Sequence, residues 1–466
     1  MDKTMKIKEL IKQDAGFQYV VDSLELMSAA GRRALLETTF SSDAEWLEAE
    51  WRRLGTAIEA VHEYKYKKPY IELRHCLMQL HDLRGTLSSL ACRTPLNEVE
   101  LFELKNLAQL RRTAAEAIAG LGMATMLPLP DTDEAFALLD PDGTGIANFY
   151  IYDSYDPRLA PLRRELKALQ EHDGDAGRIA QLLAEQSEIQ AAVCLRLTDA
   201  LHAHHDALGK TLEQMAYADI LFAKAELAIA WNLTKPTIGS RIEYRALVNP
   251  RLKHRNEATH LRYQPVDIAL GAGVTLVTGA NMAGKTVLLK SIGTAQTMVQ
   301  CGFFAPAESA ETVLFDGVAT SIGDDQDEMN GLSSYAAEII KISDIVRRCR
   351  TERLLVLIDE PARTTNPVEG KAIVQALTGI MEQASSTTLI TTHYGNLGGK
   401  CRRLRVKGFV EGMADVPLTP RNINLFIDYS LTEDASGEVP HEALRIADIL
   451  GCDSELIETA RKHINN

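Results

Sequence analysis

The sequence predicts an α + α/β chain, in which an all-helical region is followed by an α/β domain with a phosphate-binding loop. Apolar residues recur with helical spacing up to about residue 240. Beyond that point, short β-branched runs alternate with helical stretches, which is the pattern of a largely parallel sheet. One of these runs leads into a glycine-rich loop at residues 279–286. We therefore expect domains at residues 1–240 and 241–435, with a C-terminal helical element at 436–466.

The helical region is expected to be a bundle whose apolar stripes form its core. The periodic stretches of its first half are Glu45–His62, Arg74–Leu90 and Asn97–Leu121. An irregular stretch at residues 127–156 follows, and Ala147–Tyr152 within it could form a strand. Leu159–Trp231 is again helical and predicts two long helices that meet at a turn, His172–Gly177.

The α/β region is expected to hold four short strands and the helices between them. The predicted strands are Val274–Thr278, Val313–Ile322, Leu354–Ile358 and Thr388–Thr391. The end of the chain, His441–Ile464, has the pattern of two short helices.

Composition excludes several classes of protein. The chain has 466 residues, 45% of them hydrophobic and 24% charged, so it is neither disordered nor collagen-like. Its formal net charge is −14 and both halves are net negative, so a broad electrostatic surface for nucleic acid is not expected. Seven cysteines without a C-x-x-C pair predict neither a disulfide framework nor a Cys-rich zinc site. No apolar run resembles a signal peptide or a membrane span, so we expect a cytoplasmic protein without a membrane partner.

The strongest chemical motif is G-x-x-x-x-G-K-[ST], which lies between an expected strand and an expected helix. Its glycines let the backbone surround phosphate oxygens, and the amides of the helix start donate hydrogen bonds to them. Lys285 is expected to reach the β- and γ-phosphates, and Thr286 to bind Mg²⁺. The predicted ATP-binding residues of this loop are Gly279, Ala280, Asn281, Met282, Ala283, Gly284, Lys285, Thr286 and Val287.

Two further motifs follow strands later in the chain. Five apolar residues lead into Asp359 and Glu360, and we expect Asp359 to bind Mg²⁺ and Glu360 to deprotonate the attacking water. His393 ends another apolar strand, where an imidazole could donate to the γ-phosphate. The catalytic residues are therefore predicted to be Glu360, His393 and Lys285. This order of loop, paired acids and histidine indicates an ABC-type ATPase that uses ATP and Mg²⁺ rather than a GTPase or a kinase.

The segment Gly331–Glu338 combines a glycine, two hydroxyl side chains and a predicted helix start. Such a helix start can bind an anion through its free amides. It can equally be an ordinary capped helix, and the residues alone leave both interpretations open.

Residues from about 245 to 464 resemble the ATPase region of the MutS mismatch-repair family. The loop resembles the family's T-G-P-N-M-G-G-K-S, although Ala280 and Ala283 replace a proline and a glycine. Further matches, in chain order, are Gly302–Ala307 with G-x-x-V-P-A, Ile322–Asp325 with I-G-A-x-D, Leu332–Glu338 with x-S-T-F-x-x-E, Asp359–Gly370 with D-E-x-G-R-G-T-S-x-x-D-G, Thr392–Leu397 with T-H-Y-x-x-L, and the terminal helical pattern of Ala443–Ala460. Pro361, Ala362 and Thr364 depart from the acid motif and could alter the coupling between two sites.

The resemblance implies a dimer, either of identical chains or with a related chain. In this family Ser333 would reach the γ-phosphate bound by the partner, which gives two composite ATP sites. Asn281 and Met282 would line the phosphate loop. Tyr263, or Leu261 beside it, would lie against adenine.

Residues 17–232 resemble, more weakly, the MutS helical core with its two lever helices at Leu159–Ala228. We expect no mismatch-reading domain before residue 17, and the DNA clamp is reduced to the turn His172–Gly177. In this the chain resembles the short MutS-like ATPases that reactivate cobalamin-dependent aminomutases. A protein client is therefore the first hypothesis, and a DNA repair or recombination ATPase that binds duplex or branched DNA is the second. We expect any DNA binding to be weak. A scaffold that binds ATP without turnover is the third, and the intact catalytic residues argue against it.

Three lesser features have ordinary explanations. His202 and Asp206 share a helix face and could hold a metal, although a solvated face is the simpler interpretation. The basic run Lys400–Lys407 could contact phosphate, but such a run is more typical of a protected edge strand. The tyrosines and lysines of residues 64–70 could bind nucleic acid, and a helix end with extended lysines explains them as well.

Overall fold

The computed structural model describes residues 5–145, 149–172, 175–280, 283–323, 334–395, 397–398, 400–410, 422–434, 444, 447 and 451–464. The chain divides into two compact units. The sheet unit comprises Met1–Leu24, Thr38–Arg52 and Leu227–Asn466, and the helical unit comprises Glu25–Glu37 and Arg53–Glu226. Among the described residues, no helix is long and apolar enough to cross a membrane.

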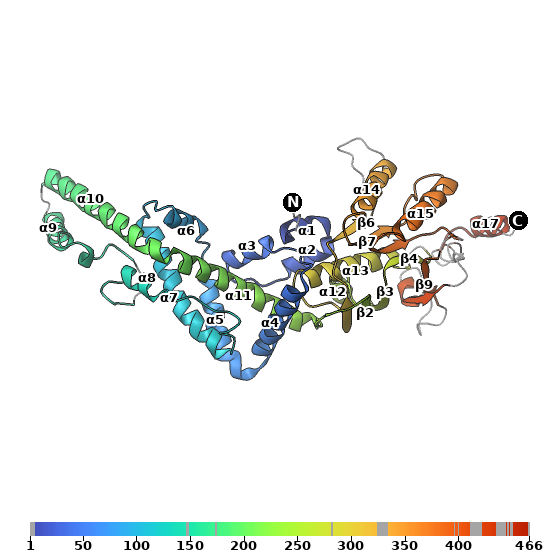
Figure 1. The fold of residues 1–466 in the computed structure, drawn as a ribbon, viewed down its shortest axis with the longest axis horizontal. Coiled ribbons are helices and arrows are strands. Elements are labelled where there is room, and N and C mark those ends of the chain that lie inside the picture. The colour runs from blue at the N-terminus through green and yellow to red at the C-terminus, as the bar shows by residue number, and fades with distance from the viewer. Residues whose placement is uncertain are drawn as a thin grey trace. The chain divides into compact units, whose positions relative to one another are not determined.

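The helical unit is built mainly from helices, as its apolar periodicity predicts (Figure 1). Its helices are α3 (Ala29–Glu37), α5 (Lys67–Met78), α6 (Arg84–Ala91), α7 (Glu98–Gly120), α8 (Asp133–Leu139), α9 (Leu159–Glu171) and α10 (Ala176–Leu201), with 3₁₀ turns at Tyr64–Tyr66, Asp153–Tyr155 and His202–His204. Two long helices, α4 (Ala44–His62) and α11 (His205–Trp231), contribute residues to both units. Buried leucines at helical spacing, among them Leu101, Leu104 and Leu107 of α7, form its core.

The irregular stretch at residues 127–156 contains α8 and a buried anchor. Residues 149–152 are not a strand, and 146–148 lie outside the described residues, so the suggestion of a strand there is wrong for the part that can be judged. Instead, the Lys105 ammonium of α7 donates to Asp140 at 3.0 Å and to the Tyr152 hydroxyl at 2.9 Å. All three side chains are buried, so this contact fixes the stretch against α7.

The main sheet of the sheet unit has the strand order β10-β9-β4-β8-β7-β6. Its strands are β4 (Gly273–Thr278), β6 (Gly317–Ser321), β7 (Leu354–Asp359), β8 (Thr387–Thr391), β9 (Arg402–Phe409) and β10 (Ile427–Glu433). All neighbours are parallel except β10 and β9. Thr391 of β8 pairs with Val277 of β4 on one side and with Asp359 of β7 on the other. The carboxyl ends of these three strands therefore meet at one edge of the sheet.

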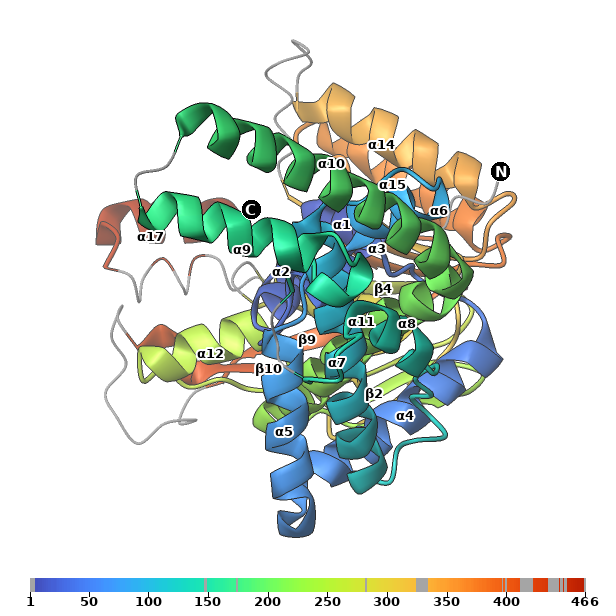
Figure 2. The same cartoon turned by 90° about the vertical axis from the view of Figure 1, so that its left-hand side faces the viewer.

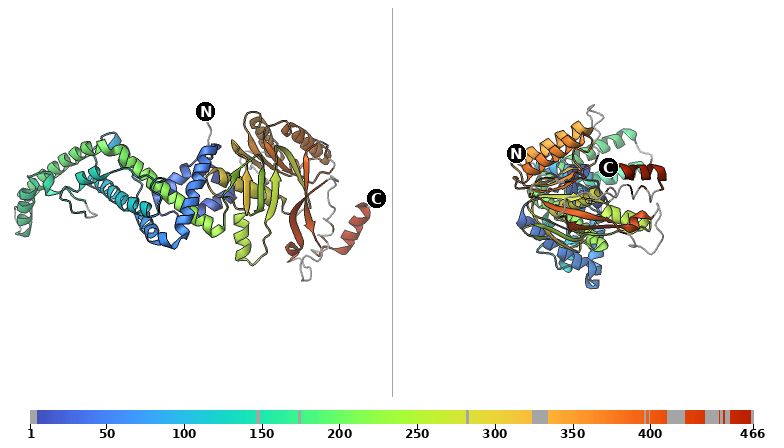
Figure 3. Two further views of the ribbon diagram at one scale, coloured as in Figure 1. Left: turned by 60° about the horizontal axis from the view of Figure 1, so that its bottom comes forward. Right: turned by 90° about the vertical axis from the view of Figure 1, so that its right-hand side faces the viewer.

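Helices cover both faces of this sheet. Alternate residues of β7 explain which helix lies on which face, because successive side chains of a strand point to opposite sides. Val356 and Ile358 join a buried cluster with α14 (Ser334–Arg348) and α15 (Pro367–Met381). Leu357 instead meets α13 (Lys285–Gln300), where its Cδ1 would lie 3.1 Å from a Cβ added to Gly293. The two orange helices α14 and α15 lie together on one side of the sheet in Figures 2 and 3.

A second sheet has the order β1-β5-β2-β3. Its strands are β1 (Thr237–Ile238), β2 (Ile242–Leu247), β3 (Val266–Leu270) and β5 (Ser309–Thr312). Between β2 and β3 lies α12 (Pro250–Ala258), which Asn249 caps by accepting a hydrogen bond from Leu252. Near the end of the chain is α17 (Ser454–Ile464), whereas most of the other helix expected in residues 441–464 lies outside the described residues.

The first two helices pack with the sheet unit, a division that differs from the expected boundary at residue 240. These are α1 (Ile7–Gln13) and α2 (Ala15–Asp22). Asp14 caps α2 and also accepts a hydrogen bond from Thr294 of α13 at 2.9 Å. The Phe17 ring meets Phe303 edge-on at 6.0 Å. Helical periodicity shows that such helices are amphipathic but not which surface covers their apolar face.

Candidate nucleotide site

The phosphate loop forms the turn between β4 and α13, as predicted. Gly284 precedes α13 with a φ of +76°, a left-handed conformation that favours glycine. A Cβ at this position would lie 2.9 Å from the ring of Tyr429, so space as well as conformation requires glycine. Gly279, Ala280, Ala283 and Thr286 are described, whereas the predicted ligands Asn281 and Met282 lie outside the described residues.

The Lys285 side chain is buried at the start of α13 and points back into the loop. Its ammonium donates to the carbonyl oxygens of Gly279 at 2.8 Å and Ala280 at 3.1 Å. It also lies 3.2 Å from a carboxylate oxygen of Glu360. The Lys285 ammonium thus connects the start of α13 to the end of β7. An ABC-type site needs positive charge at this place.

Asp359 joins the loop to two strands through its two carboxylate oxygens. The Thr286 hydroxyl donates to Oδ2 at 2.6 Å, and the Thr391 hydroxyl donates to Oδ1 at 2.5 Å. A hydroxyl and a carboxylate are the oxygen ligands that Mg²⁺ prefers, so the donor set fits this ion. The two predicted metal ligands, Thr286 and Asp359, are therefore brought together.

Glu360 lies at the end of β7 in a strained backbone conformation. Its φ is +44°, which is uncommon for a residue other than glycine. Its N–H donates to the hydroxyl and the carbonyl of Thr391, at 3.0 and 3.1 Å. Arg363 lies 3.7 Å from its second carboxylate oxygen. The predicted base therefore extends into the same small space as Lys285, although neither periodicity nor the motif predicts its left-handed backbone.

His393 follows β8 and is half-buried beside these charges. Burial lowers the pKa of the imidazole below its usual 6.5; Lys285 and Arg363 also lower it, and Glu360 opposes them. The Tyr394 ring lies 4.1 Å from the His393 ring, centroid to centroid. At neutral pH the imidazole is uncharged, so it can donate one hydrogen bond to a phosphate oxygen.

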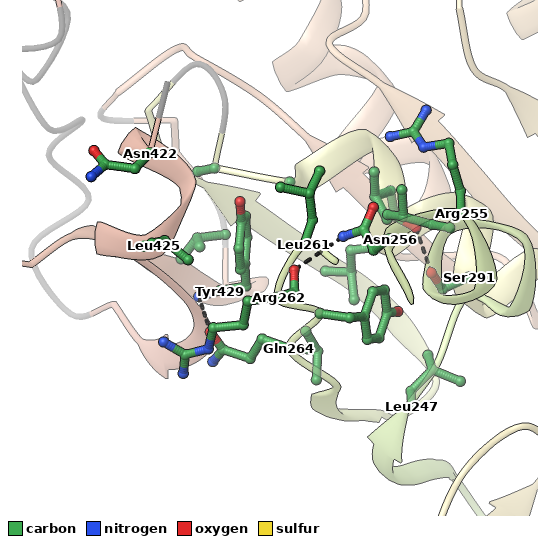
Figure 4. A pocket seen from close by; sticks show the side chains of 18 of the residues that line it. Leu247, Arg255, Asn256, Leu261, Arg262, Gln264, Ser291, Asn422, Leu425 and Tyr429 are labelled. Atoms are coloured by element: carbon green, nitrogen blue, oxygen red, sulfur yellow. Dashed lines mark hydrogen bonds between the residues drawn. The ribbon is translucent and has the colours of Figure 1, made fainter. Parts of the chain in front are cut away.

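A cavity of about 400 Å³ opens beside the phosphate loop (Figure 4). Its lining includes Ala283, Gly284 and Val287 from the loop and α13, so it adjoins the phosphate-binding groups. Residues from three other segments complete the lining: Leu247, Leu252, Arg255, Asn256, His260, Leu261, Arg262, Tyr263, Gln264 and Val266 from around α12, Val406 from β9, and Asn422, Leu425 and Tyr429 near β10. A mainly apolar cavity next to a phosphate loop suits a flat, apolar base.

Tyr263 and Leu261, the two predicted adenine contacts, both line this cavity. The Tyr263 hydroxyl accepts a hydrogen bond from the Asn249 N–H at 2.7 Å, so its ring is fixed against α12. The sequence reasoning missed Tyr429, whose ring lies against Gly284 and faces the cavity in Figure 4. Tyr429 lies 144 residues beyond Lys285, so no nearby motif connects it to the loop. Only the alternation of apolar and polar residues in β10 could have indicated which way its side chain faces.

Three other predicted features lie elsewhere. Ser333 lies outside the described residues. Among the described residues no group of three or more His, Cys, Asp or Glu side chains could hold a metal, and His202 contacts the carbonyl of Leu90 at 3.0 Å. The basic run belongs to β9. We expected an edge strand here, but β9 lies between β4 and β10 in the sheet. Two of its cations are neutralised by acids of β10, Arg402 by Glu433 and Lys407 by Asp428.

Comparison with known proteins agrees with this geometry. Residues 275–466 match the family model described as MutS domain V. The chain thus contains a MutS domain V. It is 33% identical over 235 residues to a DNA mismatch repair protein MutS of Thermus thermophilus, which covers 50% of this chain and 28% of that protein. It is 32% identical over 293 residues to an Endonuclease MutS2 of Gemmatimonas aurantiaca, covering 62% of this chain and 34% of that protein.

A third relative, an Endonuclease MutS2 of Geobacillus thermodenitrificans, is 35% identical over 217 residues. That match covers 46% of this chain and 27% of the relative. The chain thus spans about a third or less of the length of these relatives. The part that matches the family model contains the phosphate-loop residues from 279 onward, the paired acids and His393.

Proposed function

We propose that this chain belongs to the MutS family, that it binds ATP with Mg²⁺ and hydrolyses it at a site shared between two chains, and that hydrolysis drives a conformational change. The observation that carries the proposal is the convergence of three strand ends on one small space. Lys285 contacts Glu360, and Thr286 and Thr391 both donate to Asp359. This is the arrangement that phosphoryl transfer needs, because its catalysis consists of positioning and charge stabilisation.

Each side chain has a role in this mechanism. Lys285 exchanges its loop carbonyls for phosphate oxygens and stabilises the charge that develops on them. Glu360 accepts the proton of the attacking water, and His393 donates to the γ-phosphate. Thr286 and Asp359 would hold Mg²⁺, which would supply positive charge to neutralise the phosphates. The apolar cavity holds adenine between Tyr263 or Leu261 and Tyr429, which orients the phosphates toward the loop.

For the macromolecular client, we propose DNA. One relative is named a DNA mismatch repair protein and another an endonuclease, and both names refer to nucleic acid, the first of them to DNA. The comparisons give no support to the protein client that the sequence suggested. In this proposal DNA binds to the helical unit, and DNA binding changes ATP hydrolysis at the nucleotide site.

A protein client stays as the second candidate because of the charges of the helical unit. Several of its exposed or half-buried cations are paired with acids, which compete with phosphates for them. Arg112 lies 2.8 Å from Asp133, Arg178 lies 2.8 Å from Glu165, and Arg163 also pairs with Asp153. Phosphate contacts by Lys and Arg supply much of the affinity of DNA-binding proteins, so this surface favours weak DNA binding.

The ATPase proposal is tested by Glu360→Gln, which removes the base while keeping the shape of the side chain. Loss of a general base costs about 10²–10⁴-fold in turnover, and ATP binding should remain. The exposed Glu382 at the end of α15 gives a matched control, and Glu382→Gln should hydrolyse ATP like the wild type. Unchanged turnover in Glu360→Gln would remove this residue from its role.

The client is tested by an anisotropy titration at about 150 mM salt, where weak phosphate contacts no longer suffice. Matched, mismatched and four-way-junction duplexes are compared, with and without ATP. Sub-micromolar affinity for one of them, or strong stimulation of the ATPase, supports DNA as the client. If no duplex shows either effect, the DNA proposal is overturned in favour of the protein client.

A further inference from the structure

The two residues on either side of Pro361 both have left-handed backbone conformations. Glu360 has a φ of +44° and Ala362 a φ of +60°. Side chains other than glycine seldom adopt this region, so such residues keep it only when their surroundings hold them. Ala362 is completely buried. Its conformation fixes the path of the chain directly after Glu360, and with it the direction of the Glu360 side chain.

Both backbone polar groups of Ala362 are held by side chains from other elements. A carboxylate oxygen of Glu338, on α14, accepts a hydrogen bond from the Ala362 N–H at 3.2 Å. The Tyr394 hydroxyl donates to the Ala362 carbonyl, also at 3.2 Å. Burial, and after it the Glu338 carboxylate, raises the pKa of Tyr394, so its hydroxyl stays protonated and remains a donor. The contacts come from two different segments, α14 and the residues after β8, and together they define the orientation of this residue.

Two neighbouring features show that the Tyr394 contact is built into the fold. Gly370 of α15 leaves room for the tyrosine, because a Cβ there would lie 2.1 Å from the Tyr394 hydroxyl and 3.0 Å from the Ala362 carbonyl. The Tyr394 N–H donates to the Thr392 hydroxyl at 3.0 Å, which fixes the start of the segment after β8. The tyrosine ring in turn lies against His393.

We propose that Glu338 and Tyr394 are positioning residues for hydrolysis, which hold Ala362 in its left-handed conformation and thereby direct the Glu360 carboxylate. This inference rests on the proposed ATPase function. Glu360 is then held on both sides, by Thr391 before Pro361 and by the Ala362 anchor after it. Neither residue touches the reacting atoms, so both act through Glu360.

The proposal is tested by comparing Glu338→Ala with Glu338→Gln. The glutamine keeps an oxygen that accepts the Ala362 N–H, whereas alanine leaves this buried donor unpaired. We expect Glu338→Ala to lower kcat about tenfold, the factor that corresponds to one hydrogen bond to a charged acceptor. The dissociation constant for ATP should change little, and Glu338→Gln should recover most of the lost turnover. A general loss of structure would instead weaken ATP binding and lower the melting temperature.

Tyr394→Phe is the second variant, which decides the question if Glu338→Ala does not fold. It removes only the hydroxyl and keeps the ring against His393, so kcat should again fall several-fold at unchanged ATP affinity. Wild-type kcat in Tyr394→Phe and in whichever Glu338 variants fold would overturn the inference. Lys285→Ala distinguishes a failure of this inference from a failure of the proposed function. The wild type should hydrolyse ATP and Lys285→Ala should not; if the two do not differ, the ATPase proposal itself fails. If that control behaves as expected and the anchor variants do not, only the anchor is wrong.

Discussion

The two halves of the nucleotide site are built in different ways. The phosphate half consists of short motifs at the ends of three neighbouring parallel strands, and its charged groups contact one another directly: Lys285 with Glu360, and Thr286 with Asp359. The base half is a mainly apolar cavity lined from several segments between Leu247 and Tyr429. Charge chemistry needs given residue types at fixed spacing, whereas an apolar cavity needs only a shape. Substitutions in the phosphate half should therefore abolish function, and those in the base half should weaken it by degrees.

The largest effect is expected from Asp359→Asn, in the phosphate half. The neutral amide keeps the shape but no longer attracts a divalent cation, and a catalytic metal stabilises the transition state by several kcal/mol. Turnover should fall on the order of 10³-fold. Steady-state ATP hydrolysis over a range of Mg²⁺ concentrations is the measurement. Asp344→Asn, at an exposed position of α14, is the matched control, and equal losses in both variants would contradict a specific role.

Gly284→Ala tests the point where the two halves meet. The new Cβ needs a positive φ and would collide with the Tyr429 ring, so both halves should be disturbed. We expect ATP to bind roughly tenfold or more weakly, because a residue forced into this conformation costs about 1–3 kcal/mol. Nucleotide titration gives the dissociation constant. Ala283→Gly in the same loop adds no atoms and should bind ATP like the wild type; undiminished binding by Gly284→Ala would show that the loop is not used.

Tyr429→Ala tests the base half alone. Loss of one aromatic contact should raise the dissociation constant for ATP by about tenfold while kcat at saturation changes little. Tyr429→Phe keeps the ring and should bind normally. A fall in kcat without a change in affinity would place Tyr429 in the chemistry and would contradict the division of the site into two halves.

Mixing two inactive variants tests whether the phosphate half is completed by a partner chain. Lys285→Ala leaves Ser333 intact, and Ser333→Ala leaves Lys285 intact, so a mixed dimer would have one complete site. With equal amounts and random pairing, about a quarter of wild-type turnover should return. ATP hydrolysis is followed over a range of mixing ratios, after exchange of subunits has been verified. No recovery at any ratio would indicate that each chain works alone.

The smallest effect concerns pH. The lowered pKa of His393 means that the unfolded chain takes up a proton more readily than the folded one. The stability that this residue contributes is complete above the unfolded pKa of about 6.5 and is lost as pH falls through the lower, folded value. Between about pH 7.5 and 5.5 the melting temperature of the wild type should therefore fall further than that of His393→Gln. A parallel fall in both proteins would contradict the burial of the neutral imidazole.

The same difference explains how far the sequence could predict the molecule. The strands before Gly279, Asp359 and His393 were predicted within a residue or two, because buried parallel strands are continuous apolar runs that end at the motifs. The second sheet and β10 were not predicted, since their strands are short or are interrupted by polar residues and so form no continuous apolar run. For the same reason Tyr429 was missed, although Tyr263 and Leu261 were named. Positive φ angles at Glu360 and Ala362 also have no sequence signal, because the residues there are not glycine.

The most direct test of this account is photolabelling with 8-azidoadenosine triphosphate, since one ligand must occupy both halves at once. The account predicts that the label attaches to the peptide containing Leu261 and Tyr263 or to that containing Leu425 and Tyr429. ATP should compete with the label, and Lys285→Ala, at the opposite end of the ligand, should sharply reduce labelling. Labelling outside these peptides, or labelling that Lys285→Ala leaves unchanged, would contradict the claim that the loop and the cavity form one nucleotide site.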